Sequence, residues 1–224
     1  MQFLNETHYS GLQFVMVTVI PAWTYAVVYV DDYDTRLLYV WAVRSGQKAY
    51  ALSYYVTALI SAFTVSFVSN ALCIGLCVLR GSPVINPDPF KGAVYQPYEM
   101  LQDRGHLLLY VLVVLAEYAL GASVMAGLAA AFSTLTHRRL MTLCLPIFYF
   151  FLSTTTLIIS KNFPELGLQI PPMLNIDHLI RVSYFFSDGW PLANFLYKLL
   201  TCAIHWVVCG MVVVCTIERS VKNA

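Results

Sequence analysis

The sequence predicts an all-α, polytopic membrane protein whose residues 1–224 form a single transmembrane domain. Of the 224 residues, 59% are hydrophobic and 11% are charged, whereas soluble domains carry about 25% charged residues. Residues 7–30 and 49–79 contain no Asp, Glu, Lys or Arg, and a helix needs roughly 20 apolar residues to cross a bilayer. The apolar segments lack the alternation of a membrane barrel, so we predict a bundle of about five transmembrane helices.

The first two membrane spans are predicted at about residues 12–30 and 50–79. Pro21 interrupts the first, which a membrane helix tolerates because neighbouring groups satisfy the freed backbone. The second is long enough to tilt or to extend beyond the bilayer.

Three further spans are predicted at about residues 107–133, 140–160 and 191–217. The third span contains one acid, Glu117, and the fifth contains Lys198 in its first third. We expect Lys198 to extend its ammonium group to the outer interface, as long basic side chains near helix ends do.

The connections between the spans differ in charge. Residues 31–48, 134–139 and 218–224 together carry seven Lys and Arg residues, whereas the longer connections 80–106 and 161–190 carry five. The positive-inside rule therefore predicts that the first set faces the cytoplasm of a multi-pass plasma-membrane protein. An odd number of spans then places the N-terminus outside.

The connection 161–190 combines Pro171 and Pro172 with apolar residues at roughly helical spacing. A short helix at the outer membrane face, lying flat or dipping partway in, fits this pattern. An ordinary covered loop fits the periodicity equally well.

No metal, disulfide framework or nucleic-acid partner is expected. The six cysteines all fall inside apolar runs, which argues against a disulfide framework. Cys73 and Cys77 share one helical face, but no His or carboxylate lies beside them in the sequence, so we expect them to pack as small apolar residues. The near-neutral charge of +1 gives no indication of nucleic-acid binding.

Glu117 is the only acid within a predicted span, and intramembrane acids usually face protein or water. It is expected either to contact a substrate or proton, or to hold helices together through Tyr118 or Tyr149. Ser153 and Thr155, in a hydroxyl-rich stretch of the fourth span, either line a pathway or bond back to their own helix.

Enzyme signatures are missing from the sequence. It has no Gly-x-x-x-x-Gly-Lys-Ser/Thr loop for ATP, no His-Glu-x-x-His and no Gly-x-Ser-x-Gly. We therefore expect that the chain is not an enzyme and carries no cofactor of its own.

A polar connector of 18 residues, Asp31 to Lys48, separates the two long uncharged runs. Asp31, Asp32 and Asp34 end the first span, an amphipathic segment Leu37 to Val43 follows, and Arg44-Ser45-Gly46-Gln47-Lys48-Ala49-Tyr50 leads into the second span. This order resembles the ABC-2 type permeases, the membrane subunits of many bacterial ABC exporters. The small-residue run in the third span, the short basic loop and Leu145-Pro146 extend the resemblance over nearly the whole chain.

The resemblance implies that the connector holds a cytoplasmic coupling helix bound by separate ABC ATPase subunits, which would carry ATP and Mg²⁺. It implies a homo- or heterodimer with a second permease and export of a lipid, peptide or drug-like substrate. The family usually has six spans and a cytoplasmic N-terminus, whereas five are predicted here. The residues to which the resemblance assigns coupling to the ATPase are Asp34, Leu37, Leu38, Trp41, Arg44, Gly46 and Tyr50.

Two other classes of protein fit the same spans. One is a non-transport membrane protein, such as an accessory or assembly factor with no ATPase partner. The other is an intramembrane enzyme that uses Glu117.

Overall fold

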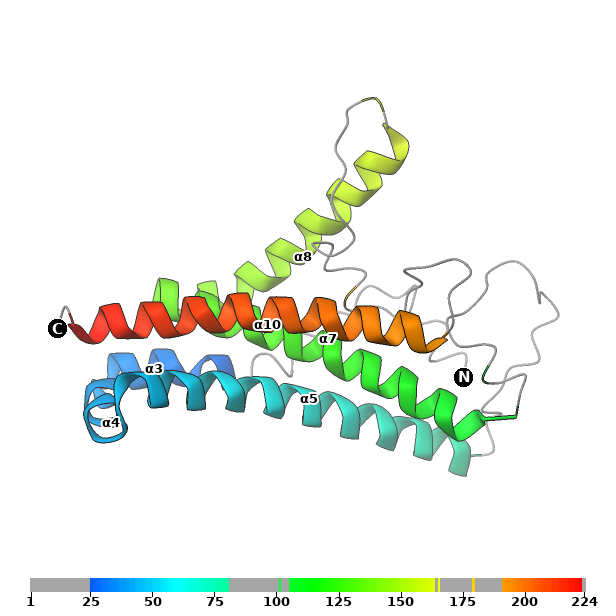
Figure 1. Cartoon of the computed structure of the whole chain (residues 1–224), viewed down its shortest axis with the longest axis horizontal. Helices are drawn as coiled ribbons and strands as arrows, with labels where there is room; N and C mark the ends of the chain where they lie inside the picture. Colours follow the sequence, from blue (N-terminus) through cyan, green and yellow to red (C-terminus); the bar gives the residue numbers. More distant parts are fainter. Residues whose placement is uncertain are drawn as a thin grey trace.

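The computed structural model describes residues 25–80, 101, 105–163, 165, 179 and 191–222. Within these residues α5, α7 and α10 lie side by side, α3 and α4 lie at one end of them, and α8 diverges at a steep angle (Figure 1). The all-α architecture is confirmed for this part of the chain. Its six helices are α3 (Val28–Asp34), α4 (Leu37–Ser45), α5 (Gln47–Leu79), α7 (Leu107–Thr136), α8 (Arg139–Asn162) and α10 (Pro191–Lys222).

Four of these helices are long and apolar enough to cross a membrane. They agree with the last four predicted spans to within a few residues, because long apolar runs with few charged residues identify such helices from composition alone. Most of the predicted first span, 12–30, and nearly all of 161–190 lie outside the described residues. The described end of the first span is helical, and α3 continues it to Asp34, further than predicted.

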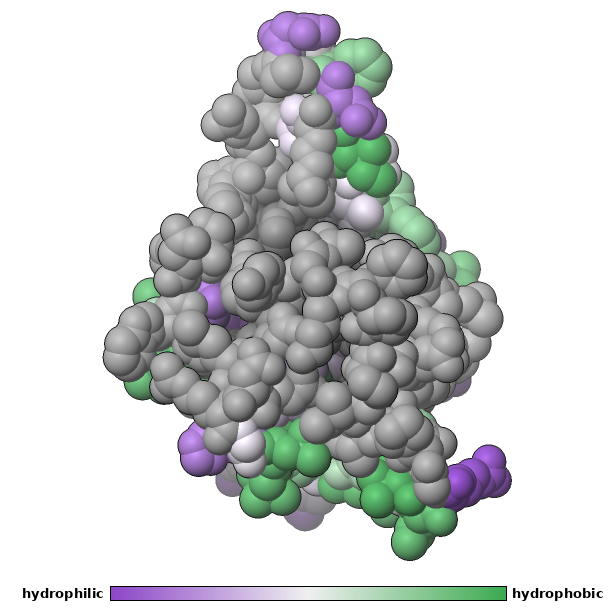
Figure 2. All heavy atoms as spheres, turned by 90° about the vertical axis from the view of Figure 1, so that its right-hand side faces the viewer, coloured by the Kyte–Doolittle hydropathy of each residue, from purple (hydrophilic) through white to green (hydrophobic). Residues whose placement is uncertain are grey.

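The central helix of the bundle is α7, which packs against α5, α8 and α10. Its small residues Ala122, Ala126, Ala129 and Ala130 are almost completely buried, and small residues let membrane helices approach closely. Large apolar side chains instead cover the outward faces of α5 and α8. Figure 2 shows hydrophobic side chains on α8 above the bundle and along the bundle's lower edge.

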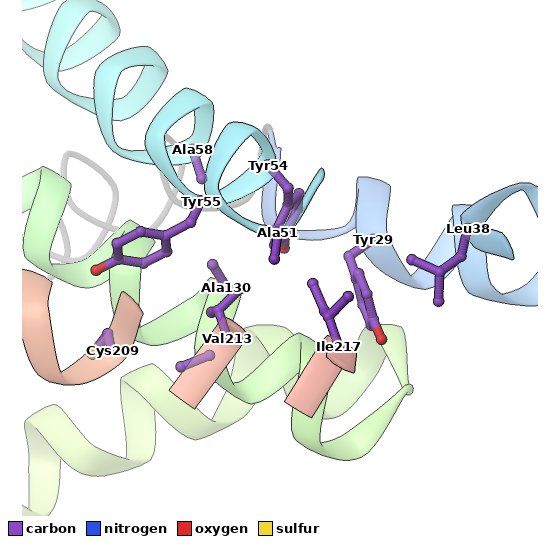
Figure 3. Packing of buried hydrophobic residues seen from close by; sticks show 11 residues of the cluster. Tyr29, Leu38, Ala51, Tyr54, Tyr55, Ala58, Ala130, Cys209, Val213 and Ile217 are labelled. Carbon is purple, nitrogen blue, oxygen red and sulfur yellow. The ribbon is translucent and has the colours of Figure 1, made fainter. Parts of the chain in front are cut away.

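Tyr55 of α5 fills the space between two glycines on neighbouring helices. A methyl group at Gly127 of α7 would lie 3.0 Å from the Tyr55 hydroxyl oxygen, and one at Gly210 of α10 would lie 3.0 Å from Tyr55 Cε1. The same hydroxyl donates a 2.7 Å hydrogen bond to the carbonyl of Trp206. Figure 3 shows Tyr55 pointing from α5 toward α10. Both glycines therefore make room for one aromatic ring that joins three helices.

We expect Gly127→Leu to disrupt this packing. The new side chain meets Tyr55 and Leu59, and overpacking of this kind typically costs about 1–3 kcal/mol. Gly75→Leu on α5 is the matched control, because no atom lies within 4 Å of its added methyl group. Thermal stability of the purified variants would be compared. If Gly127→Leu is as stable as Gly75→Leu, the described α5–α7–α10 packing is wrong.

The connections 31–48, 134–139 and the end of α10 all lie at the same end of the bundle, on the left in Figure 1. Lys48 at the start of α5 lies 3.8 Å from Glu218 near the end of α10, and Arg139 at the start of α8 pairs with Asp31 of α3. The three basic segments therefore share one side of the membrane. That this side is the cytoplasm stays a prediction from the charge asymmetry.

Thiol labelling in intact cells tests that orientation. In a chain whose native cysteines are replaced, an impermeant reagent is expected to label Gly92→Cys and Gly167→Cys, but not Ser45→Cys or Thr136→Cys. Permeabilised cells provide the control, since all four positions should then become accessible. Labelling of Ser45→Cys but not of Gly92→Cys in intact cells would reverse the orientation.

Candidate functional site

The short helix α4 is separated from its neighbours by two sharp turns. Arg36, before its first residue, is left-handed with φ 61°, and Gly46, after its last, has φ 86°. Glycine reaches such angles without the strain that a Cβ brings. The Ser45 hydroxyl donates to the Trp41 carbonyl at 2.8 Å, which completes the last turn of α4. The predicted coupling helix, 37–43, is thus a helix in the structure, and it ends two residues later.

One face of α4 is held in the chain's own core. Leu38 and Ala42, one helical turn apart, are 0% and 2% exposed. Leu38 belongs to a cluster with Tyr29, Ala51 and Ile217 of α3, α5 and α10, and Figure 3 shows it at one edge of this cluster, next to Tyr29. Leu38 was expected to face a partner, but its burial inside this cluster leaves it unavailable for one.

The other face of α4 is open. Leu37, Val40 and Trp41 are 45%, 46% and 48% exposed, and Val43 is 80% exposed. Leu37, Val40, Trp41 and the exposed Arg44 follow the i, i+3, i+4, i+7 spacing of one helical face. The sequence prediction included Leu37, Trp41 and Arg44 but missed Val40 and Val43, although the same spacing would have identified Val40.

Tyrosine hydroxyls hold the α3–α4 segment to the bundle. Tyr50, expected to open the second span, donates to Asp32 Oδ2 at 2.7 Å. Tyr54 donates to the Ala26 carbonyl at 3.0 Å, and its hydroxyl lies 2.9 Å from Ser133 Oγ of α7. Asp34, the acidic residue that the resemblance assigns to coupling, is exposed at the end of α3.

His137, in the turn between α7 and α8, stacks on the end of α3. Its ring centroid lies 4.1 Å from that of Tyr33, with 4° between the ring planes, and 5.8 Å from that of Tyr29. Burial lowers the pKa of His137 below its ordinary value, and the Asp34 carboxylate opposes this in part. The imidazole lies flat against the aromatic ring of Tyr33. The sequence contained no signal for this pairing.

An ion pair is buried between α7 and α10. Lys198 Nζ donates to Glu117 Oε2 at 3.0 Å, and the two side chains are 0% and 1% exposed. The expectation that Lys198 extends to the outer interface is wrong, because a carboxylate at matching depth offers its ammonium group a partner inside the bundle. Glu117 lies ten residues into α7 and Lys198 seven residues into α10, about 15 and 11 Å along the two helices.

Other buried polar residues lie on α5 and α10. On α5, Asn70 Nδ2 donates a 2.8 Å hydrogen bond to the carbonyl of Ser66, one helical turn earlier. On α10, the buried Thr201 lies three residues after Lys198. Apolar clusters flank the ion pair, and Phe195 packs against both of them. The buried ion pair is therefore flanked by apolar side chains of α7 and α10.

The two hydroxyl candidates on α8 differ in exposure. Ser153 is buried and Thr155 is exposed. Glu117, the other residue expected to make an interhelical polar contact, pairs with Lys198 of α10. The Thr156 hydroxyl donates to the Leu152 carbonyl of its own helix at 2.7 Å, which is one of the two alternatives predicted for this hydroxyl-rich stretch. Among the described residues, no group of three or more His, Cys, Asp or Glu side chains is placed to hold a metal ion.

Comparison with known proteins finds no match to a family model, a curated protein or a solved structure. The class of this protein is therefore defined by its fold, which is that of a multi-pass α-helical membrane protein. Two features distinguish it: a short helix with an open apolar face at one end of the bundle, and a buried ion pair toward the other.

Proposed function

We propose that this chain is the membrane-spanning subunit of an ATP-driven exporter of the ABC-2 permease type. In this proposal α4 is the helix on which separate ATPase subunits act. The observation that carries the proposal is the division of α4 into a face fixed in the core by Leu38 and an open face with Trp41 at its centre. The motif order around Asp34, Gly46 and Tyr50 supports it from the sequence.

A coupling element must be rigid on one side and accessible on the other. The buried face of α4 packs on α3 and α5, and Leu38 belongs to a cluster that also includes residues of α10, so a force on α4 would act on more than one helix of the bundle. A large, partly exposed Trp beside aliphatic residues is the kind of anchor that protein interfaces use. Closure of two ATPase subunits would then shift the bundle between inward- and outward-facing states.

We extend the proposal to assembly and substrate by resemblance alone. The chain would pair with a second copy or a sister permease in the bilayer and export a lipid, a peptide or a drug-like molecule. ATP and Mg²⁺ would be bound by the partner subunits.

The buried ion pair bears on the rival class of intramembrane enzyme. Lys198 lies at 3.0 Å from the Glu117 carboxylate, which supports a role in holding α7 and α10 together rather than in catalysis. An enzyme that depends on Glu117 would lose a hydrolytic activity in a Glu117→Gln variant, whereas a permease has no such activity to lose.

Co-purification from native membranes tests the proposal. A tagged chain extracted in mild detergent is expected to bring with it a polypeptide that contains a nucleotide-binding loop and hydrolyses ATP. The neighbouring reading frame indicates which ATPase to seek. If that ATPase is present in the membranes and the tagged chain is recovered without it, the accessory-factor class is favoured and the permease proposal fails.

A further inference from the structure

The turn between α7 and α8 is attached to α3 by two contacts. His137 follows the last residue of α7 in a left-handed conformation with φ 52°. Its backbone N–H donates to the Ser133 carbonyl at 3.0 Å. Its ring stacks on Tyr33. Two residues later, Arg139 at the start of α8 forms an ion pair with Asp31. We call these two contacts, Tyr33–His137 and Asp31–Arg139, the junction contact.

We propose that the junction contact positions α4 and passes its movement to α8. The inference rests on the proposed function, since it assigns positioning residues for the helix on which the ATPase would act. Only Thr35 and Arg36 separate α3 from α4, so the placement of α3 sets the placement of α4. The two contacts hold α3 at two positions, Tyr33 through the ring stack and, two residues earlier, Asp31 through a partly exposed ion pair.

The position of α8 makes it the helix that can respond. Its principal packing partner is α7, and beyond Phe150 its large side chains Phe151, Leu152 and Ile158 are exposed. Pro146 lies inside α8 and removes one backbone hydrogen bond from the helix. Because α8 starts at Arg139 itself, a displacement of Asp31 acts directly on its first turn, while the α5–α7–α10 packing stays in place.

Paired substitutions separate positioning from simple stabilisation. Tyr33→Leu removes the aromatic stack but keeps an apolar side chain, and Tyr33→Phe keeps the stack. Arg139→Asp removes the ion pair, and combining it with Asp31→Arg restores opposite charges. Each variant would be purified with its ATPase, and ATP hydrolysis by the complex would be compared with hydrolysis by the ATPase alone. Thermal stability of each variant is recorded so that loss of folding is recognised.

A distance measurement reports the movement of α8. In a cysteine-free chain, spin labels at Leu152→Cys on α8 and Leu72→Cys on α5, both exposed positions, would give the distance between the two helices with and without trapped ATP. We expect an ATP-dependent shift in the parental complex. Tyr33→Leu and Arg139→Asp should lose most of this shift and most of the stimulated hydrolysis. Tyr33→Phe and the charge-swapped pair should keep both.

The outcomes are distinct. Parental shifts and parental hydrolysis in Tyr33→Leu and Arg139→Asp would overturn the positioning role. Equal losses in Tyr33→Phe, or no recovery in the charge-swapped pair, would also overturn it. Failure of the proposed function would be recognised separately, because the parental chain would then co-purify without an ATPase.

Discussion

Removing either partner of the Glu117–Lys198 ion pair is expected to destabilise this protein strongly. In Lys198→Met the Glu117 carboxylate, 1% exposed, loses the ammonium group that lies 3.0 Å away. Breaking a buried pair in this way typically costs about 3–5 kcal/mol, because the remaining charge loses its counter-ion away from water. Glu117→Gln should have a comparable effect through Lys198. Thermal unfolding in lipid nanodiscs would measure both.

Three controls show whether the pairing itself matters. Lys222→Met removes an exposed lysine from the end of the same helix and should leave stability unchanged. The double variant Glu117→Gln with Lys198→Met should recover much of the loss, since replacing a whole buried pair is often neutral or stabilising. Exchanging the two charges should also recover part of it. If Lys198→Met is as stable as Lys222→Met, the ion pair does not hold α7 to α10.

Trp41→Glu is expected to abolish binding of the ATPase and leave the fold intact. Trp41 is 48% exposed and lies on the face of α4 away from the core, so the substitution costs little within the chain. At an interface it replaces an aromatic anchor by a carboxylate that must lose its water. Truncation of such an anchor alone costs about 2 kcal/mol or more, which is roughly 30-fold in affinity. Retention of the ATPase on the immobilised variant would be measured.

Two variants make the Trp41 result specific. Trp41→Phe keeps an aromatic anchor and should retain the ATPase, and Ala49→Glu, which adds the same charge at an exposed position of α5 outside α4, should retain it too. If α4 instead lies in the lipid headgroups, where Trp is also common, Trp41→Glu should lower membrane stability with no specific effect on the ATPase. Retention of the ATPase at the parental level in Trp41→Glu would show that α4 does not couple the two subunits.

The parts of this structure that follow from composition were predictable from sequence. Long apolar runs with few or no charged residues identified α5, α7, α8 and α10, and the sharp rise in polarity after residue 30 indicated a short connector. The contacts that depend on how helices rotate against each other were not. Leu38 faces inward and Val43 outward because the left-handed backbone at Arg36 sets the direction of α4. The sequence of α4 alone does not predict that direction.

The ion pair illustrates both the signal and its limit. Glu117 and Lys198 were each noticed, and both lie within ten residues of the same end of their helices. Their matched depth could have suggested a pair. Their contact also requires α7 and α10 to be neighbours with these two faces turned together, which the sequence of either helix alone does not determine. The His137–Tyr33 stack depends in the same way on the turn after α7.

Site-specific photo-crosslinking from α4 tests the central proposal most directly. A photoreactive residue at position 43, where Val43 is 80% exposed, would be activated in native membranes, with the exposed Leu72 position of α5 as the lipid-facing control. The account predicts a crosslink from position 43, and not from position 72, to a polypeptide identified by mass spectrometry as an ABC ATPase. Crosslinks from position 43 to lipid alone, in membranes that contain that ATPase, would contradict it.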